Sequence, residues 1–145
     1  MKKEDKEILL RDLSARLPYG VMLQKIDEPN TAYELYSINL EHYELYFWKY
    51  QGKALHIGDI GRLYRNNGQL RYKPYLRPMS SMTEEELKTY HSYCECDDGD
   101  FTGETLYFDT IESFDYLASI HIDYRGLIPM GLAIEVTEEN NPYKK

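Results

Sequence analysis

The sequence lacks most of the features that mark secreted, membrane-spanning or disulfide-linked proteins. It has only two cysteines, Cys94 and Cys96, which lie too close together to connect distant segments. No run of about 20 apolar residues is present, so a membrane-spanning helix is not expected. The N-terminal stretch MKKEDKEILLRDL carries acids where a signal peptide needs an apolar block. We therefore expect reduced cysteines and a cytoplasmic protein that does not contact a membrane.

Recognisable catalytic motifs are also missing: there is no G-x-S-x-G, no phosphate-binding P-loop and no glycine-rich dinucleotide pattern. Among the four histidines, only His121 has a suggestive neighbour, Asp123. On a helix, residues two apart point in nearly opposite directions and cannot relay a proton. We expect His121 to be a hydrogen-bonded core residue, and a small hydrolase or transferase that uses it is the least favoured alternative. The sequence predicts no catalytic residue and no cofactor.

Metal binding has one candidate cluster, the H-x2-C-x-C arrangement of His91, Cys94 and Cys96. It lacks the second pair of ligands that a closed zinc site requires. His91 and Cys94 also fall on the apolar stripe of a predicted helix, where packing would bury them. The acidic stretch 95–104 lacks the alternating order of a calcium-binding loop. We therefore predict that no metal is bound.

The overall composition is that of a globular protein. Of the 145 residues, 42% are hydrophobic and 29% are charged, and the formal net charge is -8. This length fits one domain, so we predict a single globular domain over 1–136 and a flexible polar tail over 137–145. Tyrosine is unusually frequent, with 15 residues against four Phe and one Trp. Tyrosine suits either half-buried sheet faces or a recognition surface.

Helical signals stand at both ends of the chain. Near the N-terminus, Pro18-Tyr19-Gly20 ends a helix whose apolar stripe comprises Leu9, Leu10, Leu13 and Leu17. A second helix begins after Thr83, which forms a capping box with Glu86. Its predicted apolar stripe comprises Leu87, Tyr90, His91 and Cys94. A third helix begins near Thr110 and continues to Ile122.

Strand signals occupy the middle of the chain. Segments 21–27, 32–40 and 43–50 alternate apolar and polar residues and are separated by turn-forming residues, which predicts an antiparallel meander. A last strand is predicted within 131–136. The predicted fold class is α+β, with an antiparallel β-meander sheet and three flanking helices in a single domain.

Charge is distributed unevenly along the chain. Residues 62–77, which we call the basic segment, hold five basic residues and no acid, whereas residues 78–145 hold four basic residues against fifteen acids. Within the basic segment, Asn67-Gly68 predicts a two-residue hairpin turn. One face of that hairpin would carry Tyr64 opposite Arg71 and Arg62 opposite Lys73, and the other face Leu63, Arg65, Leu70 and Tyr72.

A basic face with aromatic rings suits an anionic partner, either a nucleotide-like ligand or an acidic protein surface. The predicted ligand-binding residues are Arg62, Tyr64, Arg71, Tyr72, Lys73 and Arg77. An extended nucleic-acid duplex is not expected, because a chain with a net charge of -8 would be repelled by the phosphates around so small a patch. Two alternatives stay open: the acids of 78–145 neutralise the basic segment internally, or the tyrosine-rich strands 33–50 form a protein–protein adaptor surface. The sequence thus favours a non-enzymatic binding protein.

Three stretches carry a resemblance to a known family: KEDKEILLRDLSARLPYGV at 3–21, PYLRPMSSMTEEE at 74–86 and FDYLASIHIDYRGLIPMGLA at 114–133. They resemble a family of short uncharacterised proteins found in phages and mobile elements of gut bacteria. The resemblance covers most of the chain and is weakest over 27–61. It implies a context, that of an accessory protein of a mobile element in the bacterial cytoplasm, and it assigns no residue a role.

Overall fold

A computed structural model describes residues 3–28, 31–51, 54–65, 67–97, 103 and 105–143. Its helices are α1 (Lys3–Arg16), α2 (Glu84–Tyr93) and α3 (Ile111–Ser119), with short 3-10 turns η1 (Leu17–Tyr19) and η2 (Met79–Ser81). Its strands are β1 (Met22–Lys25), β2 (Tyr33–Asn39), β3 (Glu44–Gln51), β4 (Ala54–Arg62), β5 (Tyr72–Leu76), β6 (Glu95–Asp97), β7 (Leu106–Phe108) and β8 (Ile134–Glu135). The predicted α+β class is confirmed.

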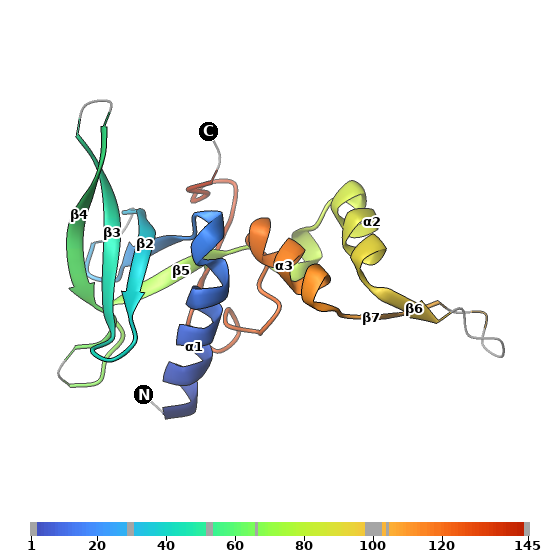
Figure 1. Cartoon of the computed structure of the whole chain (residues 1–145), viewed down its shortest axis with the longest axis horizontal. Coiled ribbons are helices and arrows are strands. Elements are labelled where there is room, and N and C mark those ends of the chain that lie inside the picture. The colour runs from blue at the N-terminus through green and yellow to red at the C-terminus, as the bar shows by residue number, and fades with distance from the viewer. Residues whose placement is uncertain are drawn as a thin grey trace.

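Six strands form the main sheet in the order β4-β3-β2-β1-β5-β8. Strands β1 to β3 follow one another as the predicted antiparallel meander. Strand β4, which was not predicted, extends the meander, and β5 returns to pair antiparallel with β1. The last strand, β8, pairs parallel with β5, so the sheet is mostly antiparallel. Figure 1 shows this sheet at one side of the molecule, with α1 beside it.

The sheet curls so that the end of β4 meets the start of β5. The amide of Arg71 donates a hydrogen bond of 2.8 Å to the carbonyl oxygen of Leu63. Gly61 permits the close approach, because a Cβ at this position would lie 2.2 Å from the hydroxyl oxygen of Tyr72. Glycine is therefore required where the two strands converge.

The hydrophobic core lies between α1 and the sheet. Leu9 and Leu13 of α1 are fully buried, as their helical spacing predicts. They belong to one cluster with leucines of the sheet and with an aromatic layer in which Phe47 contacts both Tyr33 and Tyr72, at ring-centroid distances of 5.6 and 5.0 Å. Several of the tyrosines thus serve the core.

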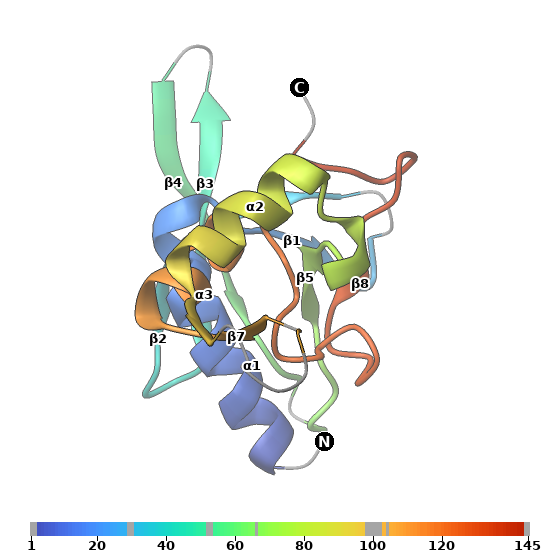
Figure 2. The same cartoon turned by 90° about the vertical axis from the view of Figure 1, so that its right-hand side faces the viewer.

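Helices α2 and α3 and strands β6 and β7 form an arm that extends away from the sheet (Figure 1). Helix α2 begins at the predicted capping box, in which the Glu86 amide donates to the Thr83 hydroxyl oxygen and the Thr83 amide donates to the Glu86 carboxylate. None of the α2 residues is buried, however, so the predicted burial of its apolar stripe is wrong. Figure 2 shows the reason: α2 lies at the end of the molecule and packs on α3, which covers only one side of it.

Two further differences from the sequence prediction occur in this arm. A loop was expected over 95–104, but β6 and β7 pair as a small antiparallel sheet. Helix α3 begins after the Thr110 cap as predicted but ends at Ser119, three residues before Ile122. His121 follows the helix with a positive φ of 65°, a conformation that ends the α-helix.

The described part of the C-terminal stretch returns to the sheet. The hydroxyl of Tyr143 donates a hydrogen bond of 2.7 Å to the carbonyl oxygen of Tyr75 in β5. A flexible tail over 137–145 stays a prediction. Among the described residues, none of the helices has the length and apolar composition needed to cross a membrane.

Candidate functional site

The turn in the basic segment closes differently from the prediction. The Gly68 amide donates to the Arg65 carbonyl oxygen, and Tyr64 pairs with Leu70 in an isolated bridge. The predicted register, with Tyr64 opposite Arg71, is therefore wrong by one residue. A type I′ turn needs two residues at positive φ, but in the described part of this turn only Gly68 has one, at 86°. The Asn67 side chain instead accepts a bond from the Gln69 amide, a local turn of its own.

Two of the five basic side chains in this segment are neutralised internally. Arg65 forms an ion pair with Asp27, which follows the end of β1. Arg77 donates from both terminal nitrogens to the Glu86 carboxylate, at 2.8 and 2.7 Å. The hydrogen bond from Arg77 lowers the pKa of Glu86 to about 2, helped by the Thr83 amide. For Arg77, the internal alternative is therefore what the structure shows.

The two predicted tyrosines of the segment lie in the core. Tyr64 is 8% exposed and Tyr72 is 5% exposed. Burial raises the pKa of Tyr64, and its hydroxyl has no hydrogen-bond partner among the described residues. Contact of these two tyrosines with a ligand stays a prediction. A partner that approaches the protein surface would meet more exposed residues first.

The remaining cations are Arg62, Arg71 and Lys73, and none of them forms an ion pair within the described parts of the chain. Lys73 pairs with Gln24 of β1, on the side of the sheet opposite the buried Leu23 and Pro74. We call this side, which faces away from α1, the outer face. Arg71 lies two residues before Lys73, immediately before β5 begins at Tyr72. Residues two apart in an extended backbone point to the same side, so this spacing places Arg71 on the side of Lys73.

Arg62 lies on the outer face as well, at the end of β4, and is exposed. It stands directly opposite Glu44 in the β3–β4 register, where opposite charges attract. The positive charge that a partner can reach therefore belongs to Arg71 and Lys73 and, beside Glu44, to Arg62.

Aromatic side chains share the outer face. Tyr36 of β2 and Trp48 of β3 contact each other edge to face, with ring centroids 4.2 Å apart, and Tyr36 is 38% exposed. Both belong to strands 33–50, which the sequence offers as an adaptor surface. The two surfaces that the sequence presents as alternatives thus belong to the same side of one sheet.

The described acids of 95–115 do not neutralise Arg62, Arg71 or Lys73. Within the described residues, none of 95–97, 103 or 105–115 forms an ion pair with Arg62, Arg71 or Lys73. Figure 1 places β6 and β7 at the far end of the molecule from β4. Residues 98–102 and 104, which hold several of the acids, lie outside the described residues.

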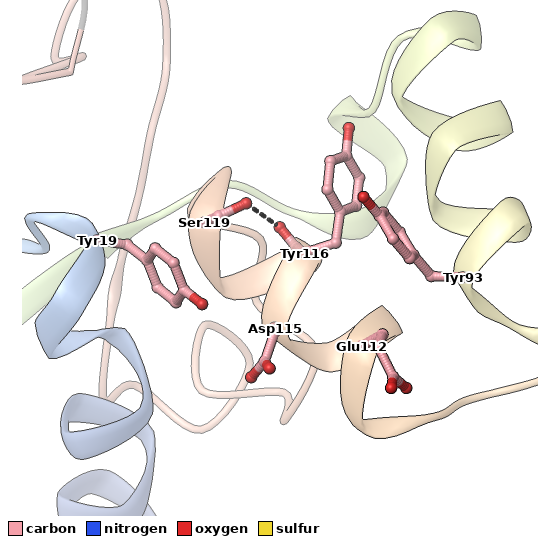
Figure 3. A pocket seen from close by; sticks show the side chains of 6 residues that line it. All are labelled: Tyr19, Tyr93, Glu112, Asp115, Tyr116 and Ser119. Atoms are coloured by element: carbon pink, nitrogen blue, oxygen red, sulfur yellow. Dashed lines mark hydrogen bonds between the residues drawn. The ribbon is translucent and has the colours of Figure 1, made fainter.

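A separate hollow of about 300 Å³ lies beside α3 and is lined by Tyr19, Tyr93, Glu112, Asp115, Tyr116 and Ser119 (Figure 3). Glu112 and Asp115 point to one side of α3, whereas Tyr116 and Ser119 point to the other. The Ser119 hydroxyl donates to the Tyr116 carbonyl oxygen at 2.6 Å, an ordinary helix contact. The lining side chains therefore do not pair a nucleophile with a base.

His121 and Asp123 do not act as a pair. Both carboxylate oxygens of Asp123 accept backbone hydrogen bonds, from the Leu127 and Ile128 amides at 2.9 and 2.8 Å. His121 is half-buried, and its Nδ1 is buried without a partner among the described residues, so the prediction of a hydrogen-bonded histidine is wrong. Burial, with the charges of Arg16 and Arg77, lowers the pKa of His121 to about 4.

A buried ionic network beside His121 was not predicted. Asp12 and Arg16 of α1 are fully buried, and the Arg16 Nε donates to the Asp12 carboxylate at 2.6 Å. Arg125 donates to the second oxygen of Asp12 at 3.0 Å, and Arg16 also donates to the Ile122 carbonyl oxygen at 2.6 Å. Asp12 and Arg16 are four residues apart on α1, which is the only sequence signal of their pairing.

The candidate metal ligands are not gathered. The ring of His91 stacks on Tyr107 at 3.6 Å, Cys94 is half-buried, and Cys96 is exposed. The predicted burial of His91 and Cys94 by packing is wrong, because α2 stands at the end of the arm. The described residues include no group of three or more His, Cys, Asp or Glu side chains placed to hold a metal ion.

Comparison of the chain with models of protein families, with curated proteins and with solved structures gives no match. The geometry of the chain itself is therefore the basis for a functional proposal.

Proposed function

We propose that this chain is a non-enzymatic binding protein that holds an acidic protein surface on the outer face of its sheet. Arg71 and Lys73 supply the charge, and Tyr36 and Trp48 supply apolar contact. The resemblance to proteins of phages and mobile elements implies an accessory role, with the partner in the bacterial host. An extended nucleic-acid duplex is not expected as the partner, because the net charge is -8.

The observation that carries the proposal is that some cations of the basic segment are paired with acids of the chain and others are not. Arg65 and Arg77 are bound to Asp27 and Glu86, whereas Arg71 and Lys73 have no ion pair within the described residues. Two like charges close together on one side of a sheet repel each other, and an anion between them relieves this repulsion. An external acid fulfils that role for Arg71 and Lys73.

A protein surface is favoured over a nucleotide because of where the aromatic rings lie. The ring of Tyr72 lies 5.8 Å from the Arg71 guanidinium carbon but is buried, so it offers no exposed face on which a nucleotide base could stack. Tyr36, an exposed aromatic residue of the outer face, is on β2, separated from β5 by β1. Charge and aromatic contact spread over several strands suit the broad, polar-rimmed interface of a protein partner.

The test uses a decaglutamate peptide as the acidic probe and ATP as the nucleotide probe. Binding of the peptide to the full chain is expected to weaken with salt, and Arg71→Glu or Lys73→Glu is expected to weaken it by about tenfold or more. Lys88→Glu is the matched control, because it makes the same charge change at an exposed position of α2. This control is expected to retain the affinity of the unsubstituted chain within about twofold.

Three results would contradict the proposal. An equal loss in Lys88→Glu would show that only net charge matters. Tight binding of ATP with none of the peptide would assign the basic face to a nucleotide. Absence of any salt-dependent binding would remove the anionic partner altogether.

A further inference from the structure

The ring of Tyr143 occupies a slot at the edge of the core, beside His121. The two rings stack almost parallel, with centroids 3.5 Å apart and an angle of 8° between their planes. The Tyr143 hydroxyl accepts a hydrogen bond of 3.0 Å from the Met22 amide and donates one of 2.7 Å to the Tyr75 carbonyl oxygen. Every polar and aromatic feature of this side chain therefore has a matching group in the slot.

The slot opens where two paired strands separate. The described register of β1 with β5 runs from Lys25 opposite Tyr72 to Leu23 opposite Pro74. The next pair in that sequence would be Met22 and Tyr75, and the Tyr143 hydroxyl lies between their backbone groups. A backbone N–H donor and a C=O acceptor are thus presented together at the end of the ladder. Any ring with an acceptor and a donor at one edge satisfies both.

The slot holds polar groups that a tyrosine does not satisfy. Arg16 is fully buried, and its Nη1 has no hydrogen-bond partner among the described residues; the buried Nδ1 of His121 has none either. The charge of Arg16 acts on both stacked rings, which places its guanidinium close to the slot. Leaving such atoms unpaired is unfavourable, and in native proteins it calls for an explanation.

Backbone strain points to the same place. His121 is one of two non-glycine residues with a positive φ among those described. A histidine in this conformation is held there by its surroundings, and such strain collects at binding sites. Here it turns the imidazole so that its face meets the ring of Tyr143.

The segment that precedes Tyr143 lies over a hollow beside the sheet. Residues 139–142, together with Ala32 and Tyr75, line a hollow of about 210 Å³. Asn140 bonds to Thr137 and Glu135, at the base of the same segment. In the described structure, the hydrogen bonds from 137–143 to residues before Glu135 come from the Tyr143 hydroxyl alone. The segment is therefore fixed to the sheet mainly at its last described residue.

We propose that the slot between His121, Met22 and Tyr75 is a binding site for a planar ring with a hydroxyl or lactam edge. Tyr143 occupies this site as an internal ligand, and residues 137–143 form a strap that an external ligand displaces. In a lactam ring, the N–H donates to the Tyr75 carbonyl and the C=O accepts from the Met22 amide. The ring face stacks on His121. This inference does not depend on the acidic partner of the outer face.

The direct test removes the internal ligand from the full chain. Tyr143→Ala is expected to bind p-cresol and uracil, seen as a rise in Tm and a shift of the Met22 amide resonance. Toluene, which has the ring without the hydroxyl, is expected to bind roughly tenfold more weakly. Tyr19→Ala, which removes another partly exposed tyrosine, is the matched control and should bind neither probe. His121→Ala added to Tyr143→Ala should abolish the binding.

The proposal is overturned if Tyr143→Ala binds neither probe, if toluene binds as well as p-cresol, or if Tyr19→Ala binds equally. Failure of Tyr143→Ala to fold would show that the strap is a structural element. Hydrogen exchange of the unsubstituted chain tests the strap independently. The Leu35 amide, bonded to the Val21 carbonyl, is the reference. The Met22 amide is expected to be at least about tenfold less protected; equal protection would contradict a displaceable strap.

Discussion

At the scale of single residues, His121 shows how position changes the chemistry of a side chain. It follows the last turn of α3, stacks on Tyr143 and leaves its Nδ1 without a partner among the described residues. Burial and the nearby charges of Arg16 and Arg77 all disfavour the protonated ring. The folded protein therefore keeps His121 neutral at a pH where the unfolded chain would protonate it.

This difference predicts a pH dependence of stability. The pKa of His121 falls from 6.5 in the unfolded chain to about 4 in the folded protein. Between these values the unfolded state binds more protons, so the free energy of unfolding is highest above pH 6.5 and decreases as the pH falls toward 4. Urea unfolding at pH 7, 6 and 5 should show this decrease. His121→Gln, which cannot be protonated, should show a smaller one; identical slopes for the two proteins would contradict the assignment.

At the scale of elements, features that depend on local sequence signals were predicted better than features that depend on tertiary packing. The end of α1 and the starts of α2 and α3 follow from breakers and caps within a few residues, and the sequence predicts these three positions correctly. The burial of α2 does not follow from its apolar stripe, because burial requires a neighbouring surface that only the fold supplies. Strands β6 and β7 were missed for a related reason: they are three residues each, and all six residues are exposed.

The cap of α2 gives a prediction at this scale. Thr83→Ala removes the acceptor for the Glu86 amide, which lies 3.1 Å from the Thr83 hydroxyl oxygen. Loss of such a cap costs about 1 kcal/mol of helix stability. Because α2 packs mainly on α3 and β6, the effect is expected to be local. Hydrogen exchange of the α2 amides should accelerate by about fivefold, while Leu35 in the sheet keeps its protection. An equal acceleration at Leu35 would show that α2 and the sheet unfold together.

At the scale of the whole molecule, the sequence predicts an α+β domain with an antiparallel meander, and the structure has one. Hydrophobic alternation and turn residues are sufficient for this because neighbouring strands pair in chain order. The register of the basic segment was not predictable from Asn67-Gly68 alone, because a turn that needs positive φ only at Gly68 competes with the two-residue turn. The buried pairing of Asp12 with Arg16 and Arg125 was also missed, since charged residues are ordinarily expected on the surface.

The basic segment brings these scales together. Its five cations look alike in the sequence, but the fold separates them into internal and external groups. Arg77 is held by Glu86 of the neighbouring helix, whereas Arg71 lies on the outer face of the sheet without an ion pair to any described residue. The proposed function depends on that separation: Arg77 is expected to contribute to the stability of the fold, and Arg71 to binding of the acidic partner.

Thermal unfolding of Arg71→Glu and Arg77→Glu, measured side by side with the unsubstituted protein, tests this separation most directly. Arg77→Glu removes both bonds to Glu86 and opposes two carboxylates, so its Tm should fall by about 5 °C or more. Arg71 forms no ion pair with a described residue, so Arg71→Glu breaks none, and its Tm should stay within about 1 °C of that of the unsubstituted protein. A fall in Tm for Arg71→Glu as large as that for Arg77→Glu would show that the outer face is neutralised within the chain, and would contradict the proposed function.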